Sequence, residues 1–141
     1  MMPVDVNSVL RAIFIGNRPV HELVGDQARP LGNYTSYEMP LVVWALRGGD
    51  TNRSLDGDEE EQNPSVQIDC YGGTFDQAKA LYEAVYDCLS SISQLIIAGH
   101  LVESVSLDQA RDDDEPLIVG QTIPDTLFTL DCRLWLQRIP E

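Results

Sequence analysis

Alternating apolar and polar positions predict β-strands in the middle and at the end of the chain. Residues 66–71 and 128–137 both alternate, so each strand has one face in a core and one outside. Residues 41–46 form an unbroken apolar run with β-branched residues at its centre, which predicts a strand covered on both faces. One polar segment joins this run to residues 66–71, so the two strands are expected to pair antiparallel. Residues 95–98 lead through Gly99 and His100 into a further strand at residues 101–107.

Apolar residues spaced three and four apart predict two longer helices with a short one between them. Asp5 can cap the first, and Thr74 with Gln77 fits a capping box at the start of the second. Pro19 and Gly25 bracket a short helical turn. The second long helix carries a broad apolar face, which predicts packing on a sheet. This face consists of Phe75, Ala78, Leu81, Tyr82, Val85, Cys88, Leu89 and Ile92.

Together these elements predict an α+β fold in one domain covering residues 1–141. We expect a single antiparallel sheet of about four strands, with helices packed on one face and the order α-β-β-α-β-β. Residues 29–38 are expected to be irregular, because glycine, asparagine and proline interrupt any pattern there.

The charge balance narrows the possible functions. The chain has 141 residues, with 23 acidic and 9 basic side chains and a net charge of −14, and Lys79 is its only lysine. This balance repels phosphate, which argues against a nucleic-acid binder or a protein held on anionic lipid. The longest apolar runs have about eight residues, far fewer than the roughly 20 that a membrane helix needs, and no secretory signal is visible.

Much of the negative charge lies in two short runs. The first contains Asp56, Asp58, Glu59, Glu60 and Glu61, and the second covers residues 112–115. The first run lies within residues 47–64, which predict a long loop inserted between two strands. This loop is either solvated or ordered against a partner. The spacing does not fit a calcium-binding EF-hand loop, although weak surface binding of divalent cations stays open.

No residue pattern predicts catalysis, a metal or a cofactor. Cys70, Cys88 and Cys132 each lie on the predicted inward face of their element, as expected for inert core residues. His21 and His100 are far apart in the sequence, and a surface or helix-cap role is expected for both. A cysteine–histidine pair formed in space stays open, but a reactive thiolate needs an electropositive setting that this chain scarcely provides.

Two strand carboxylates are candidates for an interface. Alternation places Asp69 and Asp131 on the outer faces of their strands, beside Gln67 and Arg133, where a solvated or interface salt bridge is expected. The predicted interface residues are Asp56, Asp58, Glu59, Glu60, Glu61, Asp69, Asp131 and Arg133.

Several segments give the chain a recognisable overall pattern. They are V-x-x-L-V-G-D at residues 20–26, the strand at 39–44, the strand at 66–71 and the helix start at 73–78, followed by a long final strand. In this order they resemble the tail-completion, or tail-terminator, proteins of long-tailed bacteriophages and prophages. The resemblance covers nearly the whole chain and rests on packing patterns.

This resemblance implies a structural role at the neck of a virion. It implies a small α+β protein, made in the host cytoplasm, that forms a six-fold ring on the head-proximal end of the tail tube. The partners would be further copies of the chain, the tail-tube protein and the head connector, with DNA passing through the channel unbound. No enzymatic activity, cofactor or membrane is expected.

Two other classes of function stay open. One is a non-viral binding module that recognises a basic partner through its acidic segments. The other is a small enzyme with a hidden cysteine–histidine or carboxylate site.

Overall fold

The computed structural model describes residues 5–31, 39–50, 61–107 and 127–139. Within these ranges three helices accompany six strands, which form one sheet in the order β1-β2-β3-β6-β5-β4. The elements are α1 (Val6–Gly16), α2 (Arg18–Val24), β1 (Ala28–Pro30), β2 (Leu41–Asp50), β3 (Glu61–Tyr71), α3 (Phe75–Ser90), β4 (Ser93–Ile97), β5 (His100–Leu107) and β6 (Leu127–Arg138).

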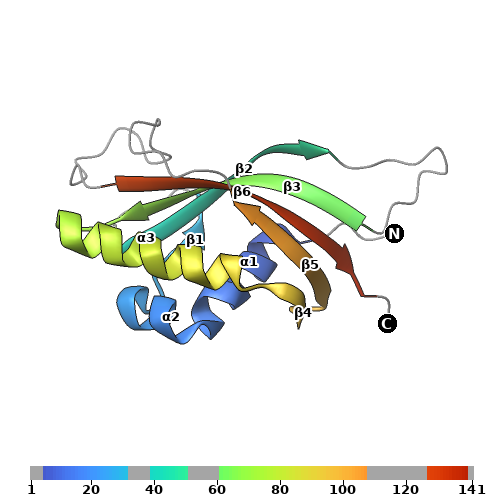
Figure 1. Cartoon of the computed structure of the whole chain (residues 1–141), viewed down its shortest axis with the longest axis horizontal. Helices are drawn as coiled ribbons and strands as arrows, with labels where there is room; N and C mark the ends of the chain where they lie inside the picture. The colour runs from blue at the N-terminus through green and yellow to red at the C-terminus, as the bar shows by residue number, and fades with distance from the viewer. Residues whose placement is uncertain (1–4, 32–38, 51–60, 108–126, 140–141) are drawn as a thin grey trace.

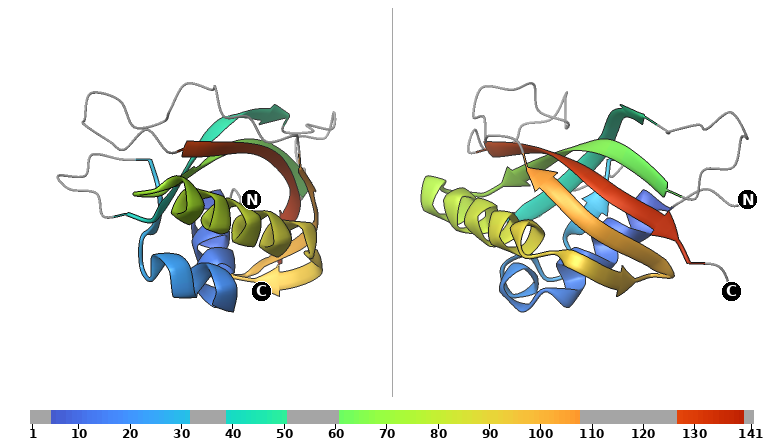
Figure 2. Two further views of the ribbon diagram at one scale, coloured as in Figure 1. Left: turned by 60° about the vertical axis from the view of Figure 1, so that its left-hand side comes forward. Right: turned by 45° about the vertical axis from the view of Figure 1, so that its right-hand side comes forward.

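The sheet is mixed and strongly curled. β1 runs parallel to β2, whereas every other neighbouring pair is antiparallel. All three helices lie on one side of the sheet, within its curve (Figure 1). Figure 2 shows the strands bending around the helices. We call the side that faces the helices the inner face and the opposite side the outer face.

The predicted four-stranded antiparallel sheet in the order α-β-β-α-β-β is therefore wrong. The sheet gains β1, which lies in the segment predicted to be irregular, and β4, which was predicted only as a lead into β5. Three residues are too few for β1 to display an alternation, and its pairing with β2 depends on chain folding. The two helices α1 and α2 also precede the first strand, where the predicted order had one.

A tight turn separates β4 from β5. Ile97 pairs with His100, which leaves Ala98 and Gly99 as a two-residue turn with φ values of 52° and 75°. Positive φ at both positions is typical of the type I′ turn that joins antiparallel strands. Glycine at the second position adopts this backbone conformation without steric cost.

The main core lies between the inner face and the helices. Leu81, Val85 and Leu89 of α3 are buried in one apolar cluster with Ile68 of β3 and Leu130 of β6. This confirms that the broad face of α3 packs on the sheet. Phe75 is the exception within the predicted apolar face, because 60% of it is exposed.

Side-chain caps fix where the two longer helices begin. The carboxylate of Asp5 accepts a hydrogen bond from the backbone N–H of Ser8, and the hydroxyl of Thr74 accepts one from that of Gln77. The Gln77 side chain, however, reaches the N–H of Gly73 instead of that of Thr74, so the predicted capping box is displaced by one residue.

One glycine sets how closely α3 approaches the end of β3. A Cβ atom on Gly72 would lie 2.4 Å from the backbone nitrogen of Ala78, too close for any side chain. Glycine is therefore required where the chain turns from β3 into α3.

β2 and β3 extend into the segment predicted as a loop at residues 47–64. Their pairing continues through Gly48 with Ser65 and Asp50 with Asn63, so the ends of that segment are strand. The connection is shorter than predicted because backbone pairing carries on past the last apolar residues. Four predicted interface residues lie outside the described residues: Asp56, Asp58, Glu59 and Glu60. Glu61 is the first residue of β3.

Candidate functional site

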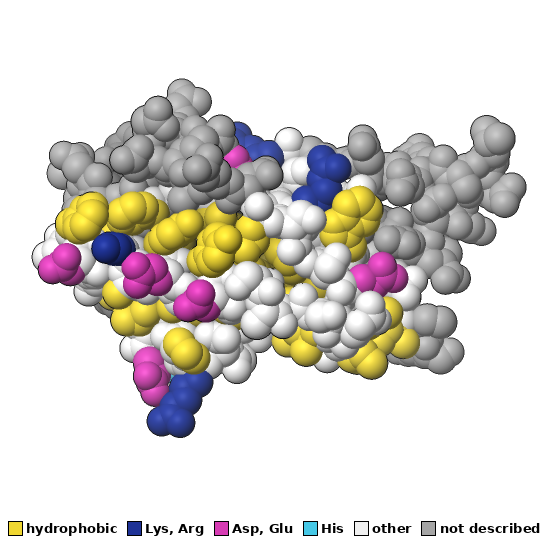
Figure 3. Space-filling view, in the orientation of Figure 1, with side chains coloured by type: hydrophobic (Ala, Val, Ile, Leu, Met, Phe, Trp, Pro, Cys, Tyr) yellow, Lys and Arg dark blue, Asp and Glu magenta, His cyan; other side chains and the backbone are white. Residues whose placement is uncertain are grey.

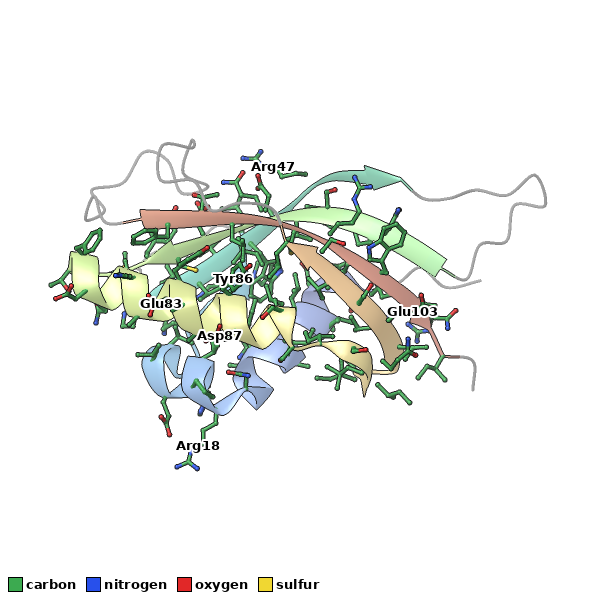
Figure 4. The ribbon with its side chains drawn as sticks, in the orientation of Figure 1. Arg18, Arg47, Glu83, Tyr86, Asp87 and Glu103 are labelled. Atoms are coloured by element: carbon green, nitrogen blue, oxygen red, sulfur yellow. The ribbon has the colours of Figure 1, made fainter. Side chains whose placement is uncertain are left out.

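Polar side chains gather on the outer face of the sheet, where no helix covers it. A groove of about 660 Å³ runs over β2, β3, β6 and β5. Its lining residues are Arg47, Ser65, Val66, Gln67, Ser106, Asp131, Cys132, Arg133 and Trp135. Figure 4 shows Arg47 on the side of the sheet away from the helices. We call this surface the outer groove.

A β-bulge places Arg47 at the groove. Leu46 pairs with Val66 and Gly48 with Ser65, so Arg47 is the extra residue of β2. Bulges commonly redirect a side chain, and here the Nε of Arg47 donates a hydrogen bond of 2.8 Å to the Oε1 of Gln67. The guanidinium group is exposed and bound through Nε to an uncharged partner.

Asp69 lies behind the groove and is fully buried. Its carboxylate accepts hydrogen bonds from the Nε2 of Gln67 at 3.1 Å, the Oη of Tyr71 at 3.0 Å and the Oγ1 of Thr129 at 3.0 Å. Asp69 is therefore not solvated, in contrast to one of the two predicted outcomes, and its place at an interface stays a prediction. Its strand face is the outer one, as predicted, but that face also carries a small apolar cluster that includes Leu41 and Tyr71.

Asp131 and Arg133 lie on β6 and line the groove together, as their shared strand face predicted. The Nε and Nη2 of Arg133 lie 3.3 and 3.2 Å from the hydroxyl of Ser65, the residue opposite it on β3. Trp135 also lines the groove, and its Nε1 donates a hydrogen bond of 3.4 Å to the hydroxyl of Ser106. The structure thus brings three predicted interface residues, Asp69, Asp131 and Arg133, into one neighbourhood.

A second surface follows α3 and consists of aromatic rings. Phe75 and Tyr82 both contact Phe128 of β6, with ring centroids 5.6 and 5.5 Å apart, and Tyr82 lies 6.0 Å from Tyr86. Figure 3 shows hydrophobic side chains in a line along α3, bordered by acidic ones. The sequence indicated Phe75, Tyr82 and Phe128 only as core residues, because their spacing cannot separate a buried stripe from an exposed edge, and it did not single out Tyr86.

At the end of this line two tyrosines and two carboxylates enclose a shallow notch. Tyr82, Glu83, Tyr86 and Asp87 line a space of about 360 Å³. Figure 4 shows the labelled Glu83, Tyr86 and Asp87 along α3. Partial burial, together with the neighbouring Tyr86, raises the pKa of Tyr82, so its ring carries no charge at neutral pH. We call this feature the α3 notch.

The cysteines are buried, as predicted. Desolvation raises the pKa of Cys70, and it raises the pKa of Cys88 to about 11, so both are protonated thiols at neutral pH. Cys132 lies in the main core. A thiolate nucleophile is not favoured at Cys70 or Cys88.

His100 is buried instead of lying at the surface, while His21 is exposed in the last turn of α2. The Nε2 of His100 accepts a hydrogen bond of 3.1 Å from the backbone N–H of Asp5. Its Nδ1 lies 2.7 Å from the carbonyl oxygen of Ala98. His100 therefore joins the β4–β5 turn to the start of α1, which is close to the helix-cap role expected for it.

The described residues contain no group of three or more histidine, cysteine, aspartate or glutamate side chains that could hold a metal ion. No helix in the described part of the chain is long and apolar enough to cross a membrane.

Comparisons with known proteins show a similarity of fold. No family model matches the sequence, and no curated protein matches it. Among solved structures, a chain described as "Virion of native gene transfer agent (GTA) particle" superposes with a TM-score of 0.50. The match covers 94% of both chains at 16% sequence identity. The two chains share a fold over nearly their whole length.

Proposed function

We propose that this protein is a structural component of a phage-like particle, and that it caps the head-proximal end of the tail tube as a ring. The observation that carries the proposal is the fold shared with a virion chain over 94% of each length. Full-length coverage matters because the whole chain, and not one common motif, matches a particle component.

The surface chemistry supports an assembly role. The outer groove is lined largely by polar side chains, and the aromatic line along α3 leaves Phe75 and Tyr86 exposed, so a contact with another subunit would bury apolar surface. In this role the tail-tube protein and the head connector are the partners. A net charge of −14 suits a channel through which DNA must slide without adhering.

The experiment is removal of the gene from a system that produces the particles. Without the cap, tail tubes should accumulate unjoined to heads, and their lengths should vary because nothing ends their growth. Supplying the wild-type protein in trans should restore joined particles of uniform length. Normal particles in the deletion strain would overturn the proposal.

A pair of matched variants tests whether complementation depends on the folded protein. Leu81→Ala opens the core and should complement poorly, because its lower stability reduces the amount of folded protein. Leu46→Ala changes a side chain that is 53% exposed and should complement fully.

A further inference from the structure

We propose that the α3 notch is the docking site for an arginine of a second copy of this chain, and that Arg47 supplies the guanidinium group. This inference deepens the proposed function and rests on it, because it names the contact between neighbouring subunits of the ring.

The notch has the chemistry of a cation site. Tyr82 and Tyr86 lie one helical turn apart, as do Glu83 and Asp87, so all four side chains share one stretch of α3. Tyrosine rings attract cations through their faces, and two carboxylates add charge. An arginine combines both interactions, because its planar guanidinium group stacks on rings and hydrogen-bonds to carboxylates.

Lys79 lies one turn before Glu83 on α3, but among the described residues no cation forms an ion pair with the notch carboxylates, Glu83 and Asp87. The ion pair found in the described part of the chain joins Arg18 and Glu22 on α2. Like charges one turn apart on a helix repel each other. A guanidinium group between them would remove that repulsion, which favours binding of a cationic side chain from outside.

The outer groove offers the matching cation. Arg47 is exposed, and its Nε bonds to the neutral Gln67, so its positive charge is not paired with a carboxylate in the described structure. Three of the other described arginines are less suitable. Arg11 bonds to the carbonyl of Ala28, Arg18 is paired with Glu22, and Arg133 is half-buried against Ser65.

The two surfaces lie on different parts of the molecule, as Figure 4 shows for Arg47 and Glu83. A contact between two different patches is heterologous, and repeating it generates either a closed ring or a filament. This is the type of contact that a ring-shaped cap requires. The like net charges of two copies repel at longer range, and salt screens this repulsion first, whereas the partly desolvated contact is screened less.

The test is a charge swap measured by analytical ultracentrifugation across rising protein concentration at moderate salt, and by electron microscopy of the protein on tail tubes. Arg47→Glu and Glu83→Arg should each weaken self-association by about tenfold or more, because each puts like charges together. The double variant R47E/E83R should recover most of the wild-type association. Circular dichroism should show that all variants are folded, because both side chains are exposed.

Two variants on α2 control for net charge. Arg18→Glu and Glu22→Arg make the same charge changes at exposed positions and should leave association unchanged. The inference is overturned if Arg47→Glu behaves like Arg18→Glu, if the double variant gains nothing, or if the wild type stays monomeric both alone and on tails. It is also overturned if Glu83→Arg weakens attachment to tails while Arg47→Glu does not, since the occupant would then be the tail-tube protein.

The outcomes separate this inference from the proposed function. If rings still form on tails with either Arg47→Glu or Glu83→Arg alone, the inferred Arg47 contact is wrong and the proposed cap function stands. If self-association responds to the charge swap as expected but the protein never attaches to tails, the proposed cap function is wrong and the inferred contact stands.

Discussion

The hydroxyl of Thr129 on β6 donates a hydrogen bond of 3.0 Å to the carboxylate of Asp69 on β3, across the middle of the sheet. Both residues are buried, and the carboxylate has two further donors in Gln67 and Tyr71. A buried carboxylate with three donors is a structural element, since it satisfies polar groups on two neighbouring strands.

Removing either side chain of this pair should therefore destabilise the protein, and the effects of the two substitutions on stability should not be additive. We expect Thr129→Val to lower the free energy of unfolding by about 1.5–3 kcal/mol, the usual range for a hydrogen bond to a charged group. Asp69→Ala should lower the free energy of unfolding further, because it leaves three hydrogen-bond donors without their acceptor. In a double-mutant cycle by urea denaturation, the combined loss should fall short of the sum by about 0.5–3 kcal/mol. Additive losses would mean that the two side chains do not interact.

Packing of α3 on the inner face gives a second prediction. Leu81→Ala and Leu89→Ala should each lower stability by about 2–5 kcal/mol, because both side chains are fully buried in the main core. Leu46→Ala, which removes the same atoms from an exposed position, should cost far less. Thermal and chemical unfolding of the three variants measures the difference. A loss below about 1 kcal/mol at Leu81 would show that the face of α3 is assigned incorrectly.

The cap of α1 gives a pH-dependent prediction. Hydrogen bonds from the Ser8 hydroxyl and backbone lower the pKa of Asp5 below 3.8. A lowered folded-state pKa contributes stability above the unfolded value, and this contribution is lost as the pH falls through the folded value. Asparagine at position 5 can still accept the capping hydrogen bond, but it carries no charge.

The advantage of the wild type over Asp5→Asn should therefore be present at pH 6 and shrink below about pH 4. Unfolding curves for both proteins across this pH range provide the measurement. An advantage that does not change with pH would contradict the role of the charge.

Thiol reactivity gives a fourth prediction. Burial raises the pKa of Cys88 to about 11, so at pH 8 the folded protein should react slowly with an alkylating reagent. Unfolding in urea should expose all three cysteines to rapid modification. Ser90→Cys places a thiol at an exposed position of the same helix and should react quickly in the folded state. Equally fast labelling of the wild type would show that its thiols are accessible.

Local signals in the sequence explain why some elements were predicted correctly. Asp5 and Thr74 cap their helices as expected, and the alternation around Ile68 and Leu130 gave the correct inner faces. These features depend on neighbours within a few residues. β1 and β4 depend on pairing with distant strands instead, and β4 begins with polar, exposed residues that show no buried face.

The candidate site was predicted only in part, for a similar reason. Alternation placed Asp69, Asp131 and Arg133 on the outer face, but it could not reveal that Asp69 is buried there beside Leu41. Burial on that face depends on packing between segments that are distant in the sequence. The α3 notch was missed because Tyr82 has the spacing of a core residue and Tyr86 lies outside the predicted apolar face.

The central claim is that this chain caps tail tubes, and the most direct measurement is electron microscopy of the purified protein added to tubes assembled without it. We predict a six-fold ring at one end of each tube, the end that joins the head, and a fixed tube length once the ring is bound. Tubes that stay bare at both ends, or protein bound along their whole length, would contradict the claim.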